Sequence, residues 1–193
     1  MNEMDFNPDA PLHIRSVSHL TIPVKDRYKA ARFYVVVLGA EVHHESTPDN
    51  VKMGRSRSLQ VGVRVCPGLE VDLFEQDYGQ PTWDQSHPHL ALDVPTEDLD
   101  RWAAHLKKWR VPFFGPMTRG QSGSGEIYFN DPDGNNLELN CPKYPGAEKL
   151  HSGPYDNQVL IYNEAWPPPE LKQEVERLFQ ASLERMRGRR QRA

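Results

Sequence analysis

Hydrophobic and polar positions follow the same order twice along the chain. HLTIPV at 19–24 alternates as a strand does and precedes a helical pattern over 26–39; HLALDV at 89–94 precedes another over 96–110. Three short extended stretches delimited by Gly, Pro and Asn follow each helix, near 40–45, 59–65 and 69–75 and then near 112–117, 125–130 and 136–141. The pattern predicts two βαβββ units, with Gly39 ending the first helix and Thr96 capping the start of the second.

This repeat predicts an α+β fold in which two modules share one curved mixed sheet, a half-barrel with helices on its convex side. We expect an N-terminal extension over 1–13, a domain over 14–142 with modules at 14–80 and 85–142, and a C-terminal extension over 143–193. Apolar residues at helical spacing predict an amphipathic helix over about 169–187. Its apolar stripe must be buried on this domain or on a partner subunit.

The alternation within four strands separates an aliphatic face from a polar one. One parity carries Leu20, Ile22, Val71, Leu73, Leu90, Leu92, Leu137 and Leu139. The other parity carries His19, Thr21, Asp72, Phe74, His89, Ala91, Glu138 and Asn140. We expect the second face to line a concave pocket. The neighbours His43 and His44 should face opposite ways and lie on the surface.

Two histidines at equivalent positions of the repeat, His19 and His89, combine with Glu138 into a two-histidine, one-carboxylate set. Such a set binds a divalent metal and leaves coordination positions open for substrate or water. If the turn between the last two strands is centred on Asp133, Tyr128 lies directly across from Glu138. There its phenol can donate a hydrogen bond or a proton to developing negative charge.

Composition narrows the class of protein. With 23 Lys+Arg and 27 Asp+Glu the net charge is −4, which disfavours nucleic acid as a partner. No apolar run approaches the roughly 18–20 residues of a membrane helix, and the first residues lack the apolar region of a signal peptide. Two cysteines are too few for a disulfide framework. We therefore expect a cytoplasmic protein without a membrane partner.

From about Ile14 to Pro142 the chain resembles the vicinal oxygen chelate superfamily, which contains glyoxalases, bleomycin-resistance proteins and extradiol dioxygenases. The resemblance rests on SHLTIPV, FYVVVLGAEV, HPHLALDV and YFNDPDGNNLEL. It implies one divalent metal held by His19, His89 and Glu138, and a small-molecule substrate bound through vicinal oxygens. It also implies a homodimer, which in some members exchanges modules.

Among reactions, the resemblance first suggests a mononuclear Fe(II) dioxygenase that cleaves the ring of a small aromatic diol, with Mn, Ni or Zn open as the metal. Tyr128, Asp131, Pro132, Gly134 and Glu138 match the second part of the extradiol signature. Upstream, however, that signature has a His where this chain has Gln121.

Three alternatives stay open. A glyoxalase- or epimerase-like isomerase or lyase would use Asp72 as a fourth ligand or a base, unless Asp72 is an exposed acid on an edge strand. A thiol transferase of the fosfomycin-resistance type is similar around Thr21 and SGEIYFNDPDG, with Arg119 as the cation for a phosphonate. A drug- or metabolite-binding resistance module is the non-enzymatic alternative. We expect substrate contacts from Thr21, Phe74, Arg119, Gln121 and Asn140.

Overall fold

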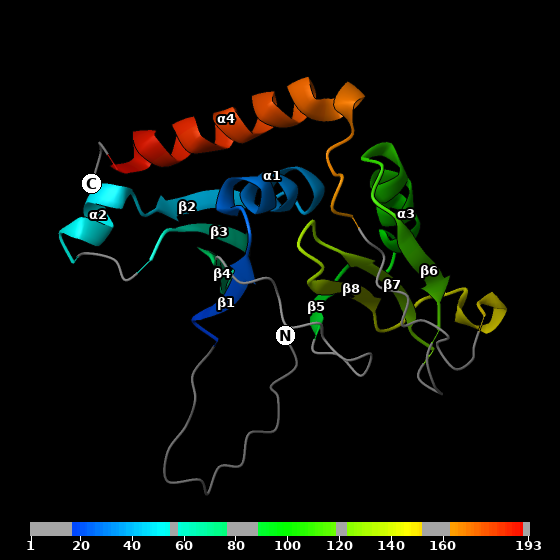
Figure 1. Cartoon of the computed structure of the whole chain (residues 1–193). Coiled ribbons are helices and arrows are strands. Elements are labelled where there is room, and N and C mark those ends of the chain that lie inside the picture. The colour runs from blue at the N-terminus through cyan, green and yellow to red at the C-terminus, as the bar shows by residue number, and fades with distance from the viewer. Residues whose placement is uncertain (1–16, 55–57, 77–88, 119–122, 152–162, 191–193) are drawn as a thin grey trace, which may run out of the picture.

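The computed structural model describes residues 17–54, 58–76, 89–118, 123–151 and 163–190, which form two modules side by side and a C-terminal extension (Figure 1). The first module contains β1 (His19–Val24), α1 (Arg27–Val37), β2 (Glu41–Glu45), α2 (Pro48–Lys52), β3 (Gln60–Cys66) and β4 (Leu69–Glu75). The second contains β5 (His89–Asp93), α3 (Leu99–Lys108), β6 (Phe113–Met117), β7 (Gly125–Asn130) and β8 (Asn136–Cys141). Within the two modules, the short helix α2 was not predicted by the hydrophobic pattern.

Each module folds its four strands into a sheet of the same topology. The strand orders are β1-β4-β3-β2 and β5-β8-β7-β6. The first strand of each module runs parallel to the last, and the remaining pairs are antiparallel. The α+β class and the βαβββ repeat are thereby confirmed. Within the described residues, the expected curved sheet consists of two separately hydrogen-bonded halves.

The helix boundaries follow from capping chemistry. The Asp26 carboxylate accepts hydrogen bonds from the backbone N–H groups of Tyr28 and Lys29, which fixes the start of α1. Gly39 follows the end of α1 at φ 70°, a conformation that suits glycine. The prediction of Thr96 as the cap of the second helix is wrong: Asp98 occupies that position, and its carboxylate pairs with Arg101 rather than with the helix backbone.

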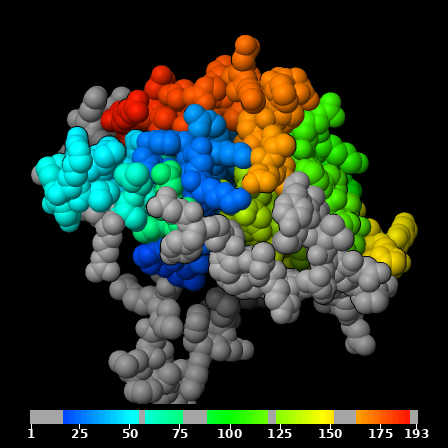
Figure 2. Space-filling model, viewed as in Figure 1, coloured from blue at the N-terminus to red at the C-terminus, as the bar shows by residue number. Residues whose placement is uncertain are grey.

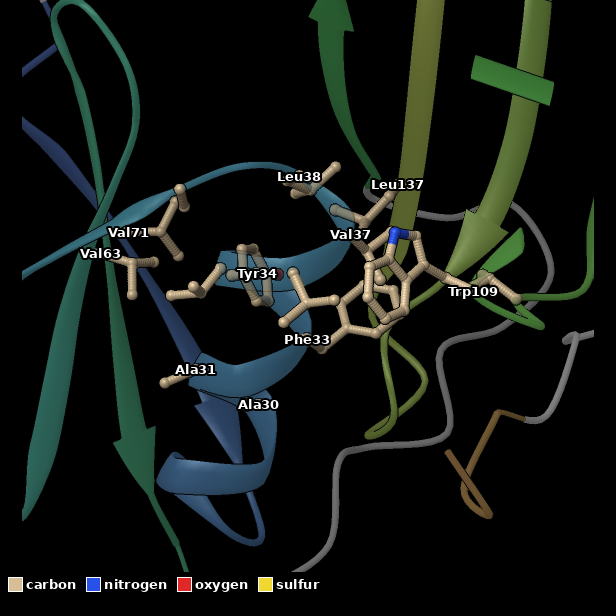
Figure 3. Packing of buried hydrophobic residues seen from close by; sticks show 14 of the residues in the cluster. Ala30, Ala31, Phe33, Tyr34, Val37, Leu38, Val63, Val71, Trp109 and Leu137 are labelled. Atoms are coloured by element: carbon tan, nitrogen blue, oxygen red, sulfur yellow. The ribbon is translucent and has the colours of Figure 1, made fainter. Parts of the chain in front are cut away.

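A cluster of aromatic rings joins the two modules (Figure 3). Phe33 of α1 lies edge-on to Trp166, with centroids 5.1 Å apart, and 6.4 Å from the centroid of Phe129 on β7. The Trp166 indole N–H donates to the carbonyl of Trp109, 2.9 Å away, just after α3. The core therefore runs from the first sheet through α1 into the second module.

The C-terminal extension ends in a one-turn 3₁₀ helix, η2 (Pro169–Leu171), and the long helix α4 (Lys172–Arg190). An earlier 3₁₀ turn, η1 (Ala147–Lys149), follows the second module. Figure 2 shows α4 lying across the first module. Its buried stripe is Val175, Phe179, Leu183 and Met186. The predicted helix is therefore present, shifted by about one turn, and its stripe packs within the chain. None of the helices that the structure describes has the length and apolarity to cross a bilayer.

Candidate metal centre

The second module brings together three of the predicted site residues. His89 begins β5, Glu138 lies on the adjacent strand β8, and Tyr128 on β7 is the register partner of Glu138, as the turn geometry predicted. The Nε2 atom of His89 lies 2.8 Å from Oε2 of Glu138. The rings of His89 and Tyr128 meet edge-to-face, with centroids 6.3 Å apart. An imidazole, a carboxylate and a phenol therefore share one face of this sheet.

The donor chemistry of this group fits a divalent transition metal. Imidazole nitrogen and carboxylate oxygen are ligands that Mn, Fe, Ni and Zn accept. Glu138 is 8% exposed, so little bulk water would compete with its contact to a cation. His89 and Glu138 supply two ligand atoms, and a third must come from elsewhere.

The first module presents a related arrangement. His19 begins β1 opposite Glu70 on β4, and Thr21 is opposite Asp72. The same offset relates His89 and Glu138 in the second module, so Asp72 occupies the position that corresponds to Glu138. The Oγ atom of Ser18 lies 3.2 Å from Nδ1 of His19. Each module therefore carries a histidine and an acid at matching places on the polar face of its sheet.

The two modules of one chain do not gather all three predicted ligands into one tight group. In such a group, three His, Cys, Asp or Glu side chains have ligand atoms that all lie within 4.8 Å of one another. Among the residues that the structure describes, one such set exists: His43, His44 and Glu70. His19 is thus not in such a group with His89 and Glu138. The three-ligand set stays a prediction, with two of its members in contact.

Asp72 lies on an inner strand, because β4 is hydrogen-bonded to β1 on one side and to β3 on the other. The residue is buried, at 9% exposure, and its Oδ1 atom is 3.3 Å from Nε2 of His44. The alternative of an exposed acid on an edge strand is therefore wrong. The roles of fourth ligand or base stay predictions.

The remaining predicted substrate contacts fall in different places. Thr21 is exposed on β1, and Phe74 is partly buried on β4, where its register partner is Pro23. Asn140 donates from Nδ2 to Oδ1 of Asp93, 3.2 Å away, which ties β8 to β5. Arg119 and Gln121 lie outside the described residues.

The histidine pair on β2 is the feature that alternation misjudged. The strand register shifts between Val42 and His44, so the pair does not alternate as in a regular strand. Both imidazoles contact Glu70, at 3.4 Å from Nε2 of His43 and at 3.0 Å from Nδ1 of His44. The expectation that the two side chains face opposite ways is therefore wrong, whereas His43 is exposed as expected and His44 is partly buried. The available signal was Gly62, because a glycine inside a strand often marks a bulge or a close approach.

The turn that connects β7 and β8 is built around a buried carboxylate. Oδ1 of Asp131 accepts from the backbone N–H groups of Asp133 and Asn135, each 2.9 Å away, and Oδ2 accepts from Nδ2 of Asn135 at 2.7 Å. Burial raises the pKa of Asp131 to about 7, against the opposing effect of these donors. The turn holds the β7–β8 hairpin that carries Tyr128 and Glu138.

Comparison with known proteins identifies the family of the chain. Residues 16–139 match the model of the Glyoxalase/Bleomycin resistance protein/Dioxygenase superfamily. Metallothiol transferase FosB of Staphylococcus saprophyticus is 26% identical over 155 residues, which cover 80% of this chain and 87% of that protein. Fosfomycin resistance protein FosX of Listeria monocytogenes is 24% identical over 151 residues, 78% of this chain and 99% of its own length.

Solved structures are similar as well. A crystal structure of Listeria monocytogenes FosX, an E126Q mutant in complex with Mn(II) and 1S,2S-dihydroxypropylphosphonic acid, has a TM-score of 0.55 and 26% identity. The match covers 68% of this chain and 95% of the FosX chain. A glyoxalase/dioxygenase from Nostoc punctiforme has a TM-score of 0.55 at 25% identity, covering 69% and 94%. The chain belongs to the glyoxalase/bleomycin resistance/dioxygenase superfamily, which is the vicinal oxygen chelate superfamily.

Proposed function

We propose that this protein is a metal-dependent enzyme that adds a thiol or water to a small electrophile held through neighbouring oxygen atoms. The observation that carries the proposal is the contact of His89 with Glu138 beside Tyr128 on one sheet face. The FosB and FosX relatives support the class of reaction, because one is a metallothiol transferase and the other a fosfomycin resistance protein. The first expectation from sequence, an Fe(II) dioxygenase, receives no specific support from these relatives.

His89 and Glu138 would hold the ion, together with His19 as third ligand. When bound, such an ion supplies Lewis acidity that stabilises negative charge on substrate oxygens. Mn(II) is the ion to test first, since the FosX structure contains it. Fe(II), Ni(II) and Zn(II) suit the same donors.

The protein's own residues then orient the reactants. Tyr128 faces Glu138 across the hairpin, so its hydroxyl is placed to donate a hydrogen bond to the oxygen that gains charge. When the nucleophile adds to an epoxide, a bond forms between the nucleophile and one ring carbon. The bond from that carbon to the ring oxygen breaks. The released oxygen takes up a proton, and the thiol or water loses one. Asp72 is the candidate to accept that proton, since it is a buried acid on the polar face of the first module.

A homodimer would complete the site, with His19 supplied by a second copy. Two observations support this. His19 does not group with His89 and Glu138 in a single chain. In addition, β1 and β5 are edge strands of their four-stranded sheets, and an edge strand can pair with another chain.

A ring-cleaving dioxygenase is the second candidate. The pairing of Tyr128 with Glu138 in register favours it, because that pair belongs to the matched part of the extradiol signature. A glyoxalase-like isomerase or lyase would draw on the same donors.

The activity test uses the full chain loaded with Mn(II). Fosfomycin, an epoxide that carries a phosphonate, is incubated with the enzyme in buffer alone, with cysteine or with glutathione, and products are followed by ³¹P NMR. We expect ring-opened product in at least one reaction and at least a hundredfold slower turnover for Glu138→Gln. If fosfomycin stays unchanged in every reaction, the proposal that the enzyme adds a thiol or water is wrong. Oxygen uptake with catechols under Fe(II) would then support the dioxygenase.

A mixing experiment tests the shared site. One variant is His19→Ala, and the other carries both His89→Ala and Glu138→Ala. Each variant alone should be inactive, whether the site lies within one chain or is shared between two. After they are unfolded together and refolded, mixed dimers with shared sites contain one intact site each, so part of the activity should return. If each chain builds its own site, the mixture stays inactive.

A further inference from the structure

We propose that His43, His44 and Glu70 form a second binding site for a divalent transition-metal ion, with Zn²⁺ as the best-fitting ion. The site lies on the first module and shares no ligand with the predicted centre of His19, His89 and Glu138, although Glu70 is the register partner of His19 and His44 contacts Asp72. It does not depend on the proposed function. Its basis is the three ligand atoms within 4.8 Å of one another.

The distances match what zinc requires. Zinc binds imidazole nitrogen and carboxylate oxygen at about 2.0–2.2 Å in a tetrahedral arrangement, so two ligand atoms on one ion are about 3.3 Å apart. Oε1 of Glu70 lies 3.0 Å from Nδ1 of His44, and Oε2 lies 3.4 Å from Nε2 of His43. Small side-chain rotations would therefore place one ion between the three groups. A water molecule or an external ligand would take the fourth position.

The strand geometry around the site brings both imidazoles to Glu70. The irregularity between Val42 and His44 allows two consecutive imidazoles to reach the same acid. Gly62 is opposite His44 on β3, and a Cβ there would be 2.2 Å from Cε1 of His44. Glycine thus leaves the space in which the His44 ring crosses β3 toward β4.

Groups behind the ligands support a metal-bound His44. Its second nitrogen, Nε2, lies 3.3 Å from Oδ1 of Asp72 and 3.0 Å from Nε2 of Gln60. A histidine that binds metal through one nitrogen usually donates its other N–H to a carboxylate or carbonyl, which fixes the tautomer. The buried Asp72 oxygen can accept that hydrogen bond. The Gln60 amide can also accept it after a half-turn that presents its oxygen.

Arg64 competes with the ion at His43. Its Nη2 atom lies 3.1 Å from Nδ1 of His43. Arginine only donates hydrogen bonds, so this contact requires Nδ1 of His43 to be unprotonated and places the ring proton on Nε2, the atom that faces Glu70. Binding of an ion at Nε2 moves the proton to Nδ1 and displaces Arg64, which is exposed and can swing away.

Zn²⁺ binding to the full chain, measured by equilibrium dialysis and metal analysis after treatment with a chelator, tests the proposal. We expect two ions per chain. The His43→Ala variant should bind one ion at the predicted centre, and its affinity for Zn²⁺ at the His43, His44 and Glu70 site should be at least tenfold weaker. Arg64→Gln should tighten that same site severalfold, because glutamine carries no charge and can accept the His43 N–H. His151→Ala, which changes an exposed histidine on another segment, is the matched control and should bind as the wild type does.

The outcomes separate this site from the predicted centre. If the double variant His89→Ala, Glu138→Ala loses one ion and His43→Ala loses the other, two sites exist as proposed. If the wild type binds one ion that His43→Ala abolishes, the second site stands and the metal centre of the proposed function fails. The proposal is overturned if His43→Ala binds Zn²⁺ as the wild type does, if the wild type binds none, or if His19→Ala removes the same ion as His43→Ala.

Discussion

The hydroxyl of Tyr34 lies 3.4 Å from Oδ2 of Asp131, and both side chains are fully buried. Tyr34 belongs to α1 of the first module, whereas Asp131 begins the turn between β7 and β8 of the second. The backbone N–H of Lys25 reinforces this link by donating to Oδ1 of Asp133 in the same turn, 2.9 Å away. The hairpin that carries Tyr128 and Glu138 is therefore fixed to the first module by polar contacts as well as by aromatic packing.

Replacement of Asp131 by asparagine should flatten the pH dependence of stability. Burial raises the pKa of Asp131 to about 7 in the folded protein, against about 3.9 for an unfolded chain. Between these values the folded state holds a proton that the unfolded state has released, so the free energy of unfolding falls as pH rises from about 4 to about 7. The slope is at most about 1.4 kcal/mol per pH unit. Urea unfolding of wild type and Asp131→Asn at pH 4 to 8 measures it.

The difference in unfolding free energy between wild type and Asp131→Asn isolates the effect of Asp131, because the two proteins share all other titratable groups. Asp131→Asn should gain stability relative to wild type as pH rises, and the gain should level off above pH 7. Asp49→Asn changes an exposed acid and should run parallel to wild type. A constant difference between wild type and Asp131→Asn across this range would show that Asp131 is ionised throughout.

Gly62→Ala should disturb the polar face of the first module. The added methyl group would be 2.2 Å from Cε1 of His44 and 2.8 Å from Oδ1 of Asp72, so His44 must leave its position over β3. We expect a loss of about 1–3 kcal/mol in the free energy of unfolding, the usual cost of overpacking. Urea unfolding measures this loss. Gly188→Ala in α4 is the control: nothing lies within 4 Å of its added methyl, and helix propensity should make it neutral or stabilising by up to about 1 kcal/mol. Equal stability of both variants would mean that His44 does not occupy the described position.

Ser182→Ala tests how α4 is attached to the outer strand β2. The Ser182 hydroxyl accepts the backbone N–H of Val42, 2.9 Å away, and both groups are buried. Alanine leaves that N–H without a partner, which should cost about 1–3 kcal/mol in thermal or urea unfolding. Gln173→Ala, an exposed change on the same helix, should stay within about 0.5 kcal/mol of wild type. A Ser182→Ala protein as stable as the control would contradict this attachment.

Most of the fold could be predicted because the two modules repeat a simple alternation. Buried aliphatic residues at every second position, such as Val71 and Leu73, identify strands that are covered on one face. Gly39 gave the end of the first helix, and the helical pattern that begins at residue 26 gave its start, where the structure places Asp26 as the cap. The start of the second helix was predicted wrongly at Thr96, because the residue at the N-cap, Asp98, makes no side-chain bond to the helix backbone.

The candidate site was predictable only within a module. The position of Tyr128 opposite Glu138 followed from the length of one turn, and that register is confirmed. The contacts of His43 and His44 with Glu70 could not be derived, because a bulge shifts the register and leaves no mark in the alternation itself. The distance from His19 to the second module depends on how two sheets pack, and no local pattern encodes that packing.

Mn²⁺ binding by variants of the three predicted ligands tests the central claim most directly. Measured by electron paramagnetic resonance in a His43→Ala background, the protein should bind one Mn²⁺ per chain. His19→Ala, His89→Ala and Glu138→Ala should each weaken that binding at least tenfold, whereas His151→Ala should not. Retention of full Mn²⁺ affinity by all three ligand variants would contradict the assignment of His19, His89 and Glu138 as the metal centre.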